Sequence, residues 1–253
     1  MSQLDLALAA EVSARHLSFL ESGRAQPSEA MVLRLLGVLE APLRDQNECL
    51  RAAGYAPRFP DTELSDADAG IEAVISRMLK QQEPFPLTVM GAGYNIIRAN
   101  GAALRIFQNF CLKPPAPAET INLFDLVFSP ERARRYIQNW RQLGGVMVTR
   151  LHHEALRKSD DAQLWSLLDR VLAYPDVPAG WKHFDIENDA APTCPLILAN
   201  DDVTLKFVMT VTAFSAPRHV AIEEMRVESY FPSNAETEAY CQGAVDISSD
   251  APR

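Results

Sequence analysis

Residues 2–24 read SQLDLALAAEVSARHLSFLESGR and carry the strongest structural signal of this chain. Ser2 and Ser13 each precede a segment with helical apolar spacing, and a serine in that position can cap the free N–H groups at the start of a helix. Ala7 is small enough to let a second helix cross closely. Gly23 suits the end of that second helix. The segment therefore predicts two short crossed helices joined by a tight turn.

The apolar spacing divides the side chains of this helix pair into two sets. The set that we expect inside comprises Leu6, Ala9, Ala10, Val12, Leu17 and Leu20. The set that we expect outside comprises Ala14, Arg15, Ser18 and Phe19. Residues that project from the N-terminal half of such a second helix are the ones that a DNA major groove would meet.

These residues resemble the lambda-repressor-like, or xenobiotic-response-element, class of helix-turn-helix transcription regulators. The signature SQxxLAxxxxVSxxxLSxLExGRxxPS is matched almost position for position from Ser2 to Ser28. The resemblance implies that double-stranded DNA is a partner and that the chain acts as a homodimer. It also implies a DNA-facing set, with the last member on the phosphate backbone: Gln3, Ser13, Ala14, Arg15, Ser18, Phe19 and Arg24.

The start of the sequence departs from that class, in which an arginine-rich helix normally precedes the motif. We therefore expect either a misassigned start or a helix-turn-helix bundle without its first helix. Residues 1–60 contain six arginines and seven acidic residues, although phosphate contacts require local positive charge. An alternative interpretation follows, in which the chain is a sensor or interaction module without competent DNA binding.

Turn signals and composition divide the chain into domains. Pro27-Ser28 and Ala41-Pro42 are expected to open two further helices, and Gly54-Tyr55 to end the helical run. The segment that follows contains two prolines and has no apolar period, which is typical of a linker. The predicted organisation is a helix-turn-helix domain at 1–56, a linker at 57–66, a second domain at 67–246 and a disordered tail at 247–253.

The second domain is expected to mix helices with an antiparallel sheet, so that the whole chain is α+β. Helical spacing predicts helices over residues 67–82, 101–110, 124–140, 151–172 and 234–243. Segments rich in valine, threonine, phenylalanine and isoleucine predict strands over residues 87–90, 94–98, 182–187, 196–200, 204–214 and 220–230.

A second resemblance, to MmyB-like ligand-binding domains, covers about two thirds of the chain. It is carried by EPFP at 83–86, YNIIRAN at 94–100, Asn122-Leu123 followed by FSP at 128–130, and residues 212–232. The resemblance implies a PAS-like α/β fold around a buried cavity for a small apolar ligand. In some members that ligand is a long-chain fatty acid, and we expect no other cofactor.

The residues that would form this ligand site are candidates of two kinds. The expected wall residues are Phe124, Leu126, Trp140, Phe207 and Met209, for each of which ordinary core packing is the alternative. Arg98 and Asn100 are the expected anchors for a carboxylate, because a buried anion needs charge-assisted partners. Arg105 could be a third anchor. The alternative is that Asn100 is a helix cap and that both arginines lie in solvent, and for Arg105 this alternative is preferred.

Composition and motifs argue against other classes of protein. The net charge is −9, and the longest apolar runs, at 196–199 and 207–211, are too short to cross a membrane. The N-terminus lacks a signal-peptide pattern, so we expect a cytoplasmic location. The four cysteines are scattered, and no metal site is predicted. An enzyme would have to use residues 152–154, or Asp185 and Glu187, but no hydrolase, P-loop or zinc-protease motif accompanies them.

Overall fold

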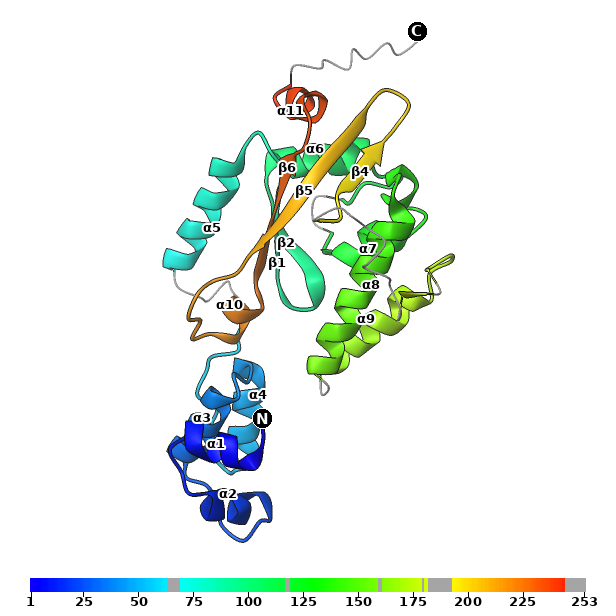
Figure 1. Ribbon diagram of the computed structural model, residues 1–253. Helices are drawn as coiled ribbons and strands as arrows, with labels where there is room; N and C mark the ends of the chain where they lie inside the picture. Colours follow the sequence, from blue (N-terminus) through cyan, green and yellow to red (C-terminus); the bar gives the residue numbers. More distant parts are fainter. Residues whose placement is uncertain (63–68, 117–118, 159–160, 179, 182–192, 244–253) are drawn as a thin grey trace. The chain divides into compact units, whose positions relative to one another are not determined.

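A computed structural model of the chain describes residues 1–62, 69–116, 119–158, 161–178, 180–181 and 193–243 (Figure 1). The chain divides into two compact units that are interleaved in sequence. The first unit consists of Met1–Asp68 together with Phe214–Glu224. The second unit consists of Ala69–Ala213 together with Met225–Arg253. The polypeptide therefore leaves the first unit after Asp68 and returns to it for Phe214–Glu224.

The first unit is helical in its described part. Its helices are α1 (Gln3–Ala9), α2 (Ala14–Glu21), α3 (Glu29–Val38), α4 (Leu43–Ala52) and α10 (Val220–Glu224). The Oγ atoms of Ser2, Ser13 and Ser28 accept hydrogen bonds from the first turns of α1, α2 and α3. The caps predicted at Ser2 and Ser13 are therefore confirmed, and Ser28 caps the helix that Pro27-Ser28 was expected to open.

The inner face of α1 differs in one position from the prediction. Ala7, Ala10 and Leu17 are buried, and Leu6, Val12 and Leu20 are partly buried, but Ala9 is exposed. Residues three apart on a helix share a face, so Ala10 lies on the face of Ala7 and Ala9 points away from it. The prediction that Ala9 packs inside was therefore wrong.

The second unit contains an antiparallel sheet of six strands in the order β3-β2-β1-β6-β5-β4. The strands are β1 (Leu87–Met90), β2 (Asn95–Ala99), β3 (Ile121–Asn122), β4 (Leu196–Ala199), β5 (Thr204–Thr212) and β6 (Arg226–Pro232). The early hairpin β1–β2 therefore pairs with β6, which comes near the end of the chain. This arrangement confirms the α+β class and the antiparallel sheet.

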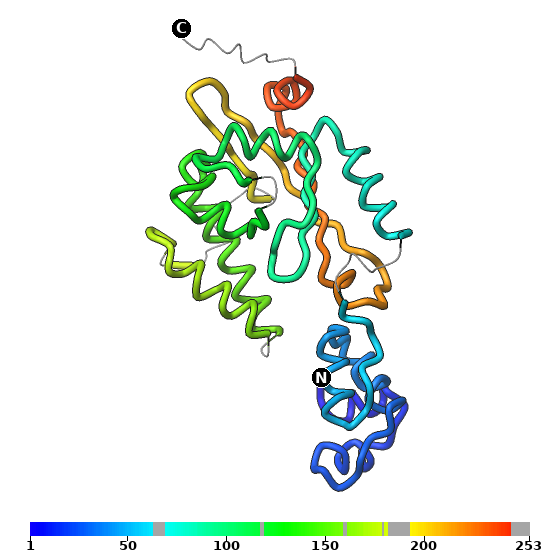
Figure 2. Tube along the Cα trace, turned by 180° about the vertical axis from the view of Figure 1, so that it is seen from behind, coloured from blue at the N-terminus to red at the C-terminus, as the bar shows by residue number. Residues whose placement is uncertain are grey.

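Helices cover this sheet and close its ends. They are α5 (Ala69–Gln82), α6 (Gly101–Asn109), α7 (Leu123–Phe128), α8 (Trp140–Arg157), α9 (Ala162–Leu172) and α11 (Ala235–Cys241), with short 3-10 turns at η2 (Ala92–Tyr94) and η3 (Arg134–Tyr136). Both views show α8 and α9 side by side on one side of the sheet and α5 on the other (Figures 1 and 2).

Three sequence predictions need correction. Residues 151–172 are largely helical but do not form one helix, because α8 ends at Arg157 and α9 begins at Ala162. Residues 124–140 do not form one helix, because α7 stops at Phe128 and Ser129 is extended, as the residue before a proline usually is. The next long helix instead begins at Trp140 and continues through Gly144 and Gly145, whose weak helix propensity hid it. Both glycines are buried, and Gly144 lies close to the Trp140 and Phe128 rings, so packing outweighs propensity there.

Residues 220–230 are not one strand either. Residues 220–224 form α10, and β6 begins only at Arg226. The His219 ring nitrogen accepts a hydrogen bond from the Ala221 N–H, and this local cap favours a helix over the strand that valine and isoleucine suggested. The strand predicted at 182–187 lies outside the described residues.

Candidate functional site

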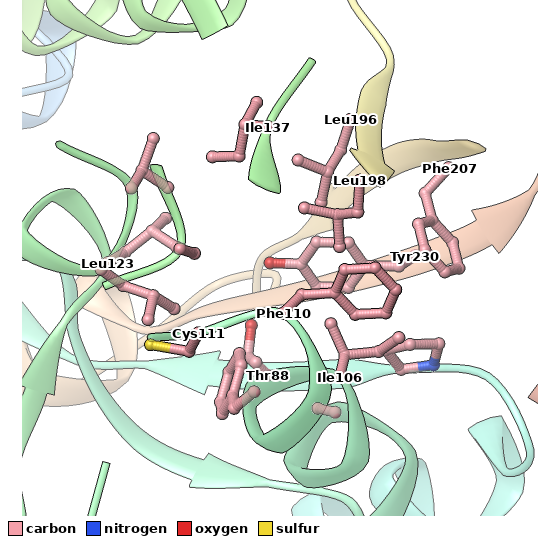
Figure 3. A pocket seen from close by; sticks show the side chains of 16 residues that line it. Thr88, Ile106, Phe110, Cys111, Leu123, Ile137, Leu196, Leu198, Phe207 and Tyr230 are labelled. Atoms are coloured by element: carbon pink, nitrogen blue, oxygen red, sulfur yellow. The ribbon is translucent and has the colours of Figure 1, made fainter. Parts of the chain in front are cut away.

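An apolar cavity lies between the sheet and helices α6 and α7 (Figure 3). Its volume is about 60 Å³. Its walls come from β1, α6, α7, β4, β5, β6 and the segments between them: Pro86, Thr88, Ala103, Ile106, Phe107, Phe110, Cys111, Leu123, Leu126, Val127, Ala133, Ile137, Leu196, Leu198, Phe207 and Tyr230. Figure 3 shows the hydroxyl groups of Thr88 and Tyr230 set among these apolar side chains. Its lining suits an apolar group, but its volume is well below the roughly 300–1,000 Å³ of typical ligand sites, so a whole ligand must displace wall side chains.

A second cavity, of about 220 Å³, adjoins the first. The two cavities share the wall residues Leu123, Val127, Leu196 and Tyr230. The second cavity also contains Arg150, on α8, and the carboxyl group of Glu228, on β6. The pair of cavities therefore has an apolar end and a polar end.

The polar groups between the two cavities are unusually buried. The Tyr230 hydroxyl donates to Glu228 Oε2 at 2.8 Å, and burial raises the pKa of both groups. Thr88 Oγ1 lies beside the Tyr230 hydroxyl, but among the described residues it has no hydrogen-bond partner of good geometry. A buried hydroxyl without a partner loses its hydration and gains nothing in return. This cluster is therefore suited to meet a polar group of a ligand.

A network of charged groups supports the polar end of the second cavity. Tyr94 donates a short hydrogen bond to Glu154 on α8, and Arg226 Nη2 bonds to Glu154 Oε1 at 2.8 Å. Burial, assisted by the nearby Glu154 carboxylate, raises the pKa of Tyr94 to about 12. The Arg150 guanidinium lies 5.9 Å from the centre of the Tyr94 ring. Arg150 is exposed, so its charge can serve an anion that enters from solvent.

The structure places four of the seven expected ligand residues at the cavities. Leu126 and Phe207 line the first cavity, and Phe124 and Met209 line the second. The other three residues, Arg98, Asn100 and Trp140, have partners elsewhere.

Arg98 pairs with Glu72 of α5 and lines a separate outer groove. Asn100 caps α6, and its Oδ1 also accepts from the Leu87 N–H at 3.0 Å. The Trp140 ring belongs to the core and donates to the Val127 carbonyl at 3.3 Å. These three residues therefore have structural partners and do not reach either cavity.

Sequence reasoning did not find Thr88, Glu228 or Tyr230. Alternate residues of a strand share a face, so Glu228 and Tyr230 were bound to lie together once β6 was placed. The signal that could have found them is a carboxylate within the apolar strand that runs from Val227 to Phe231. Thr88 gave no comparable signal, because a threonine in a buried strand is ordinary.

The candidate DNA-facing residues lie on α1, α2 and the turn after α2. Gln3, Ser13, Arg15 and Arg24 are exposed, and Ala14, Ser18 and Phe19 are partly exposed. The Arg15 guanidinium stacks over the Phe19 ring, with 5.3 Å between its central carbon and the ring centre. Gln3 Nε2 bonds to Glu21 Oε2 at 2.5 Å, which ties the start of α1 to the end of α2. The helix pair thus presents its polar side chains outward.

Comparison with known proteins agrees with both units. Residues 71–243, more than half of the chain, match the MmyB-like transcription regulator ligand binding domain. The chain belongs to this family. Residues 1–46 match the helix-turn-helix family. This MmyB-like protein therefore combines a helix-turn-helix with a ligand-binding domain, and both matched families are regulatory and not enzymatic.

Other comparisons add little to this MmyB-like assignment. No curated protein matches the chain. One similar solved structure is described as an RNA-binding light-oxygen-voltage receptor, at 15% identity over 96% of this chain, with a TM-score of 0.26. The chain spans 62% of the length of that protein. A likeness this weak supports no conclusion about the fold or the function of this chain.

Two features are absent from the described residues. No group of three histidine, cysteine, aspartate or glutamate side chains is placed to hold a metal ion. None of the helices in that part of the chain combines the length and the apolar character needed to cross a bilayer.

Proposed function

We propose that this chain is a one-component transcription regulator that binds DNA as a homodimer and senses a fatty acid. The observation that carries the proposal is the apolar cavity with buried polar groups at one end, in a chain that also carries a helix-turn-helix. The strand order, in which the first hairpin pairs with the last strand, supports a PAS-like description of the ligand-binding domain.

The DNA half of the proposal rests on α2. A recognition helix meets base edges with the side chains near its N-terminus, where Ala14, Arg15, Ser18 and Phe19 lie. Arg24 follows Gly23, whose φ of +70° turns the chain after the helix, and is placed to reach a phosphate. Since two such helices read half-sites about one DNA turn apart, a homodimer is the functional form that we propose.

The ligand half rests on the two adjoining cavities. An acyl chain would occupy the apolar cavity against Leu126 and Phe207, and its carboxylate would meet Arg150 at the polar end. The side chains that the cavities share, among them Leu196 and Tyr230, stand between them. A chain long enough to use both cavities must displace those side chains, so that binding would move β4 and β6.

A sensor or interaction module without competent DNA binding is the second candidate. It is favoured by the charge of residues 1–60, where seven acidic residues slightly outnumber six arginines. Nonspecific DNA affinity depends on cations that release counterions from phosphates, so this unit would bind random DNA weakly.

The decisive experiment selects duplexes from a random DNA library with the purified chain and measures the affinity of the enriched sequence by fluorescence anisotropy. A reproducible motif with two half-sites would support the regulator, whereas failure to enrich any motif would favour the sensor alternative. Native mass spectrometry and calorimetry with sodium palmitate test the ligand in parallel. A chain that takes up no palmitate would remove the fatty-acid assignment.

A further inference from the structure

The segment Phe214–Glu224 connects two strands of the ligand-binding domain but folds with the helix-turn-helix unit. It joins β5 to β6, and it lies within the residues that match the ligand-binding family. Its contacts nevertheless place it in the first unit, together with Met1–Asp68. The strand connection is therefore a structural part of the helix-turn-helix unit.

Glu223 in this segment caps helix α4. The residue before α4 is Pro42, whose side chain cannot form a hydrogen bond, so the first turn of α4 has no local side-chain cap. Glu223 Oε2 accepts a hydrogen bond from the Leu43 N–H at 2.8 Å, although the two residues are 180 positions apart in sequence. A carboxylate at this end of a helix also opposes the positive end of the helix dipole.

Glu224 fixes the same helix by an ion pair. Its carboxylate is buried and accepts from Arg44 Nε at 2.9 Å and from Arg44 Nη2 at 3.0 Å. Arg44 also bonds to Asp61 at 2.9 Å, which holds the guanidinium in place. Two parallel hydrogen bonds between an arginine and a carboxylate fix the relative orientation of the two groups as well as the distance between them. The segment can therefore move little without moving the start of α4.

Two further contacts, one between backbone groups and one between side chains, attach the segment to the residues after α4. The Val220 N–H donates to the Pro60 carbonyl at 3.0 Å, and the His219 ring lies 3.2 Å from Thr62 Oγ1. The segment thus holds residues after α4 as well as its first turn.

The two strands that lead into and out of this segment carry the walls of the cavities. Phe207 and Met209 line them from β5, and Glu228 and Tyr230 line them from β6. Val211 of β5 pairs with Glu228 of β6 in the last rungs before the segment. Tyr230 lies on β6, and β6 begins two residues after Glu224. A ligand that displaces Tyr230 therefore acts on the strand that follows the segment directly.

We propose that Phe214–Glu224 transmits occupancy of the cavities to the helix-turn-helix unit through Glu223 and Glu224. The proposal rests on the proposed function, because it needs a ligand in the cavities and DNA at α2. Movement of β5 and β6 shifts α10, which pulls on the first turn of α4. Helix α4 packs against α3, and α3 packs against α1, so the displacement reaches the DNA-reading pair. Ligand and DNA affinity are then coupled, and each changes the other by the same factor.

The test uses the full chain and compares three forms of it. These are the native chain, the double variant Glu223→Gln with Glu224→Gln, and a control that removes two exposed carboxylates, Glu48→Gln with Glu236→Gln. The Kd for a selected DNA duplex is measured by anisotropy with and without saturating sodium palmitate. Calorimetry gives the palmitate Kd of each form, and circular dichroism checks folding.

We expect palmitate to change the DNA Kd of the native and control chains by about fivefold or more. In the double variant the change falls below about twofold, while the palmitate Kd and the DNA Kd without palmitate stay near the native values. If the double variant does not fold, Glu223→Ala alone, which removes the acceptor of the Leu43 N–H and leaves the Arg44 pair intact, is expected to lose part of the response.

A full response in the double variant would overturn the coupling role and leave the proposed function intact. If palmitate has no effect on the native chain, Leu198→Trp supplies the stimulus instead, because the larger ring fills the first cavity without any ligand. A change in DNA Kd caused by Leu198→Trp, and lost when Glu223 and Glu224 are also replaced, supports the coupling and rejects only palmitate. If neither stimulus changes the native DNA Kd, the proposed function and the coupling both fail.

Discussion

Glu224 and Arg226 are separated only by Met225, but their side chains belong to different units. The Glu224 carboxylate pairs with Arg44 of α4 in the first unit, and the Arg226 guanidinium pairs with Glu154 of α8 in the second. The carboxylate of each pair is buried, so removing either arginine would weaken the compensation of a buried charge. The chain is therefore anchored in both units within three residues.

Removal of the distant cap should destabilise the first unit. Glu223→Ala leaves the Leu43 N–H without its acceptor, and loss of a helix cap typically costs about 1 kcal/mol. We expect this loss in the free energy of unfolding measured with urea. Glu48→Ala, at an exposed site on α4, is the control and should change stability little. Equal stability of the two variants would show that the Glu223 contact contributes nothing.

Local signals in the sequence were sufficient for most elements but not for this attachment. The caps at Ser2, Ser13 and Ser28 act on N–H groups three residues away, so the sequence alone predicts them. Glu223 acts on Leu43 across 180 positions, and no local pattern encodes that contact. The strand predicted at 220–224 was wrong for a different reason, because the strand propensity of valine and isoleucine outweighed the local cap that His219 provides.

The candidate cavity was predictable in kind but only partly in its residues. Leu126 and Phe207 were predicted as wall residues because large apolar side chains are usually buried, and both line the first cavity. Arg98 and Asn100 were chosen for their chemistry, but Glu72 and the start of α6 engage them. Glu228 was missed because a charged residue in a strand usually faces solvent.

DNA affinity should depend on the exposed face of α2. Arg15→Ala with Ser18→Ala removes two side chains that we propose to face the major groove, and each good base contact is worth about 1–3 kcal/mol of discrimination. We expect the double variant to bind the selected duplex at least about tenfold more weakly, with a melting temperature close to that of the native chain. A large fall in melting temperature would instead indicate that these side chains support the fold.

The buried hydroxyl of Thr88 should be dispensable for folding. Thr88→Val replaces an unpaired polar atom with a methyl group of the same shape, which is expected to be neutral or stabilising. The matched control is Thr237→Val, because Thr237 is equally buried and its Oγ1 accepts from the Lys206 N–H at 2.8 Å. That control should lose about 1–3 kcal/mol of unfolding free energy. If Thr88→Val is as damaging as Thr237→Val, the Thr88 hydroxyl has a partner within the protein.

Stability should carry a pH dependence that comes from Glu228. Burial raises the pKa of this carboxyl above its ordinary value of 4.5, so the folded state favours the protonated form. Such a group stabilises the fold fully below its unfolded pKa, and this contribution is lost as the pH rises through the folded pKa. We expect the unfolding free energy of the native chain to fall, relative to Glu228→Gln, as the pH rises above the ordinary carboxyl pKa of 4.5. Parallel curves for the two proteins would mean that Glu228 is ionised in the folded state.

Affinity for a fatty acid should depend on the charge of Arg150. Arg150→Met keeps most of the apolar stem but removes the cation beside the second cavity, so the carboxylate of palmitate would lose its attraction there. Arg157→Met is the matched control, because Arg157 is an exposed arginine near the end of the same helix. Calorimetry at low salt should show weaker palmitate binding for Arg150→Met only, and added salt should narrow the difference because exposed charges are screened. Equal affinities of the two variants would place the carboxylate elsewhere, and the buried cluster at Glu228 and Tyr230 would then be the next position to test.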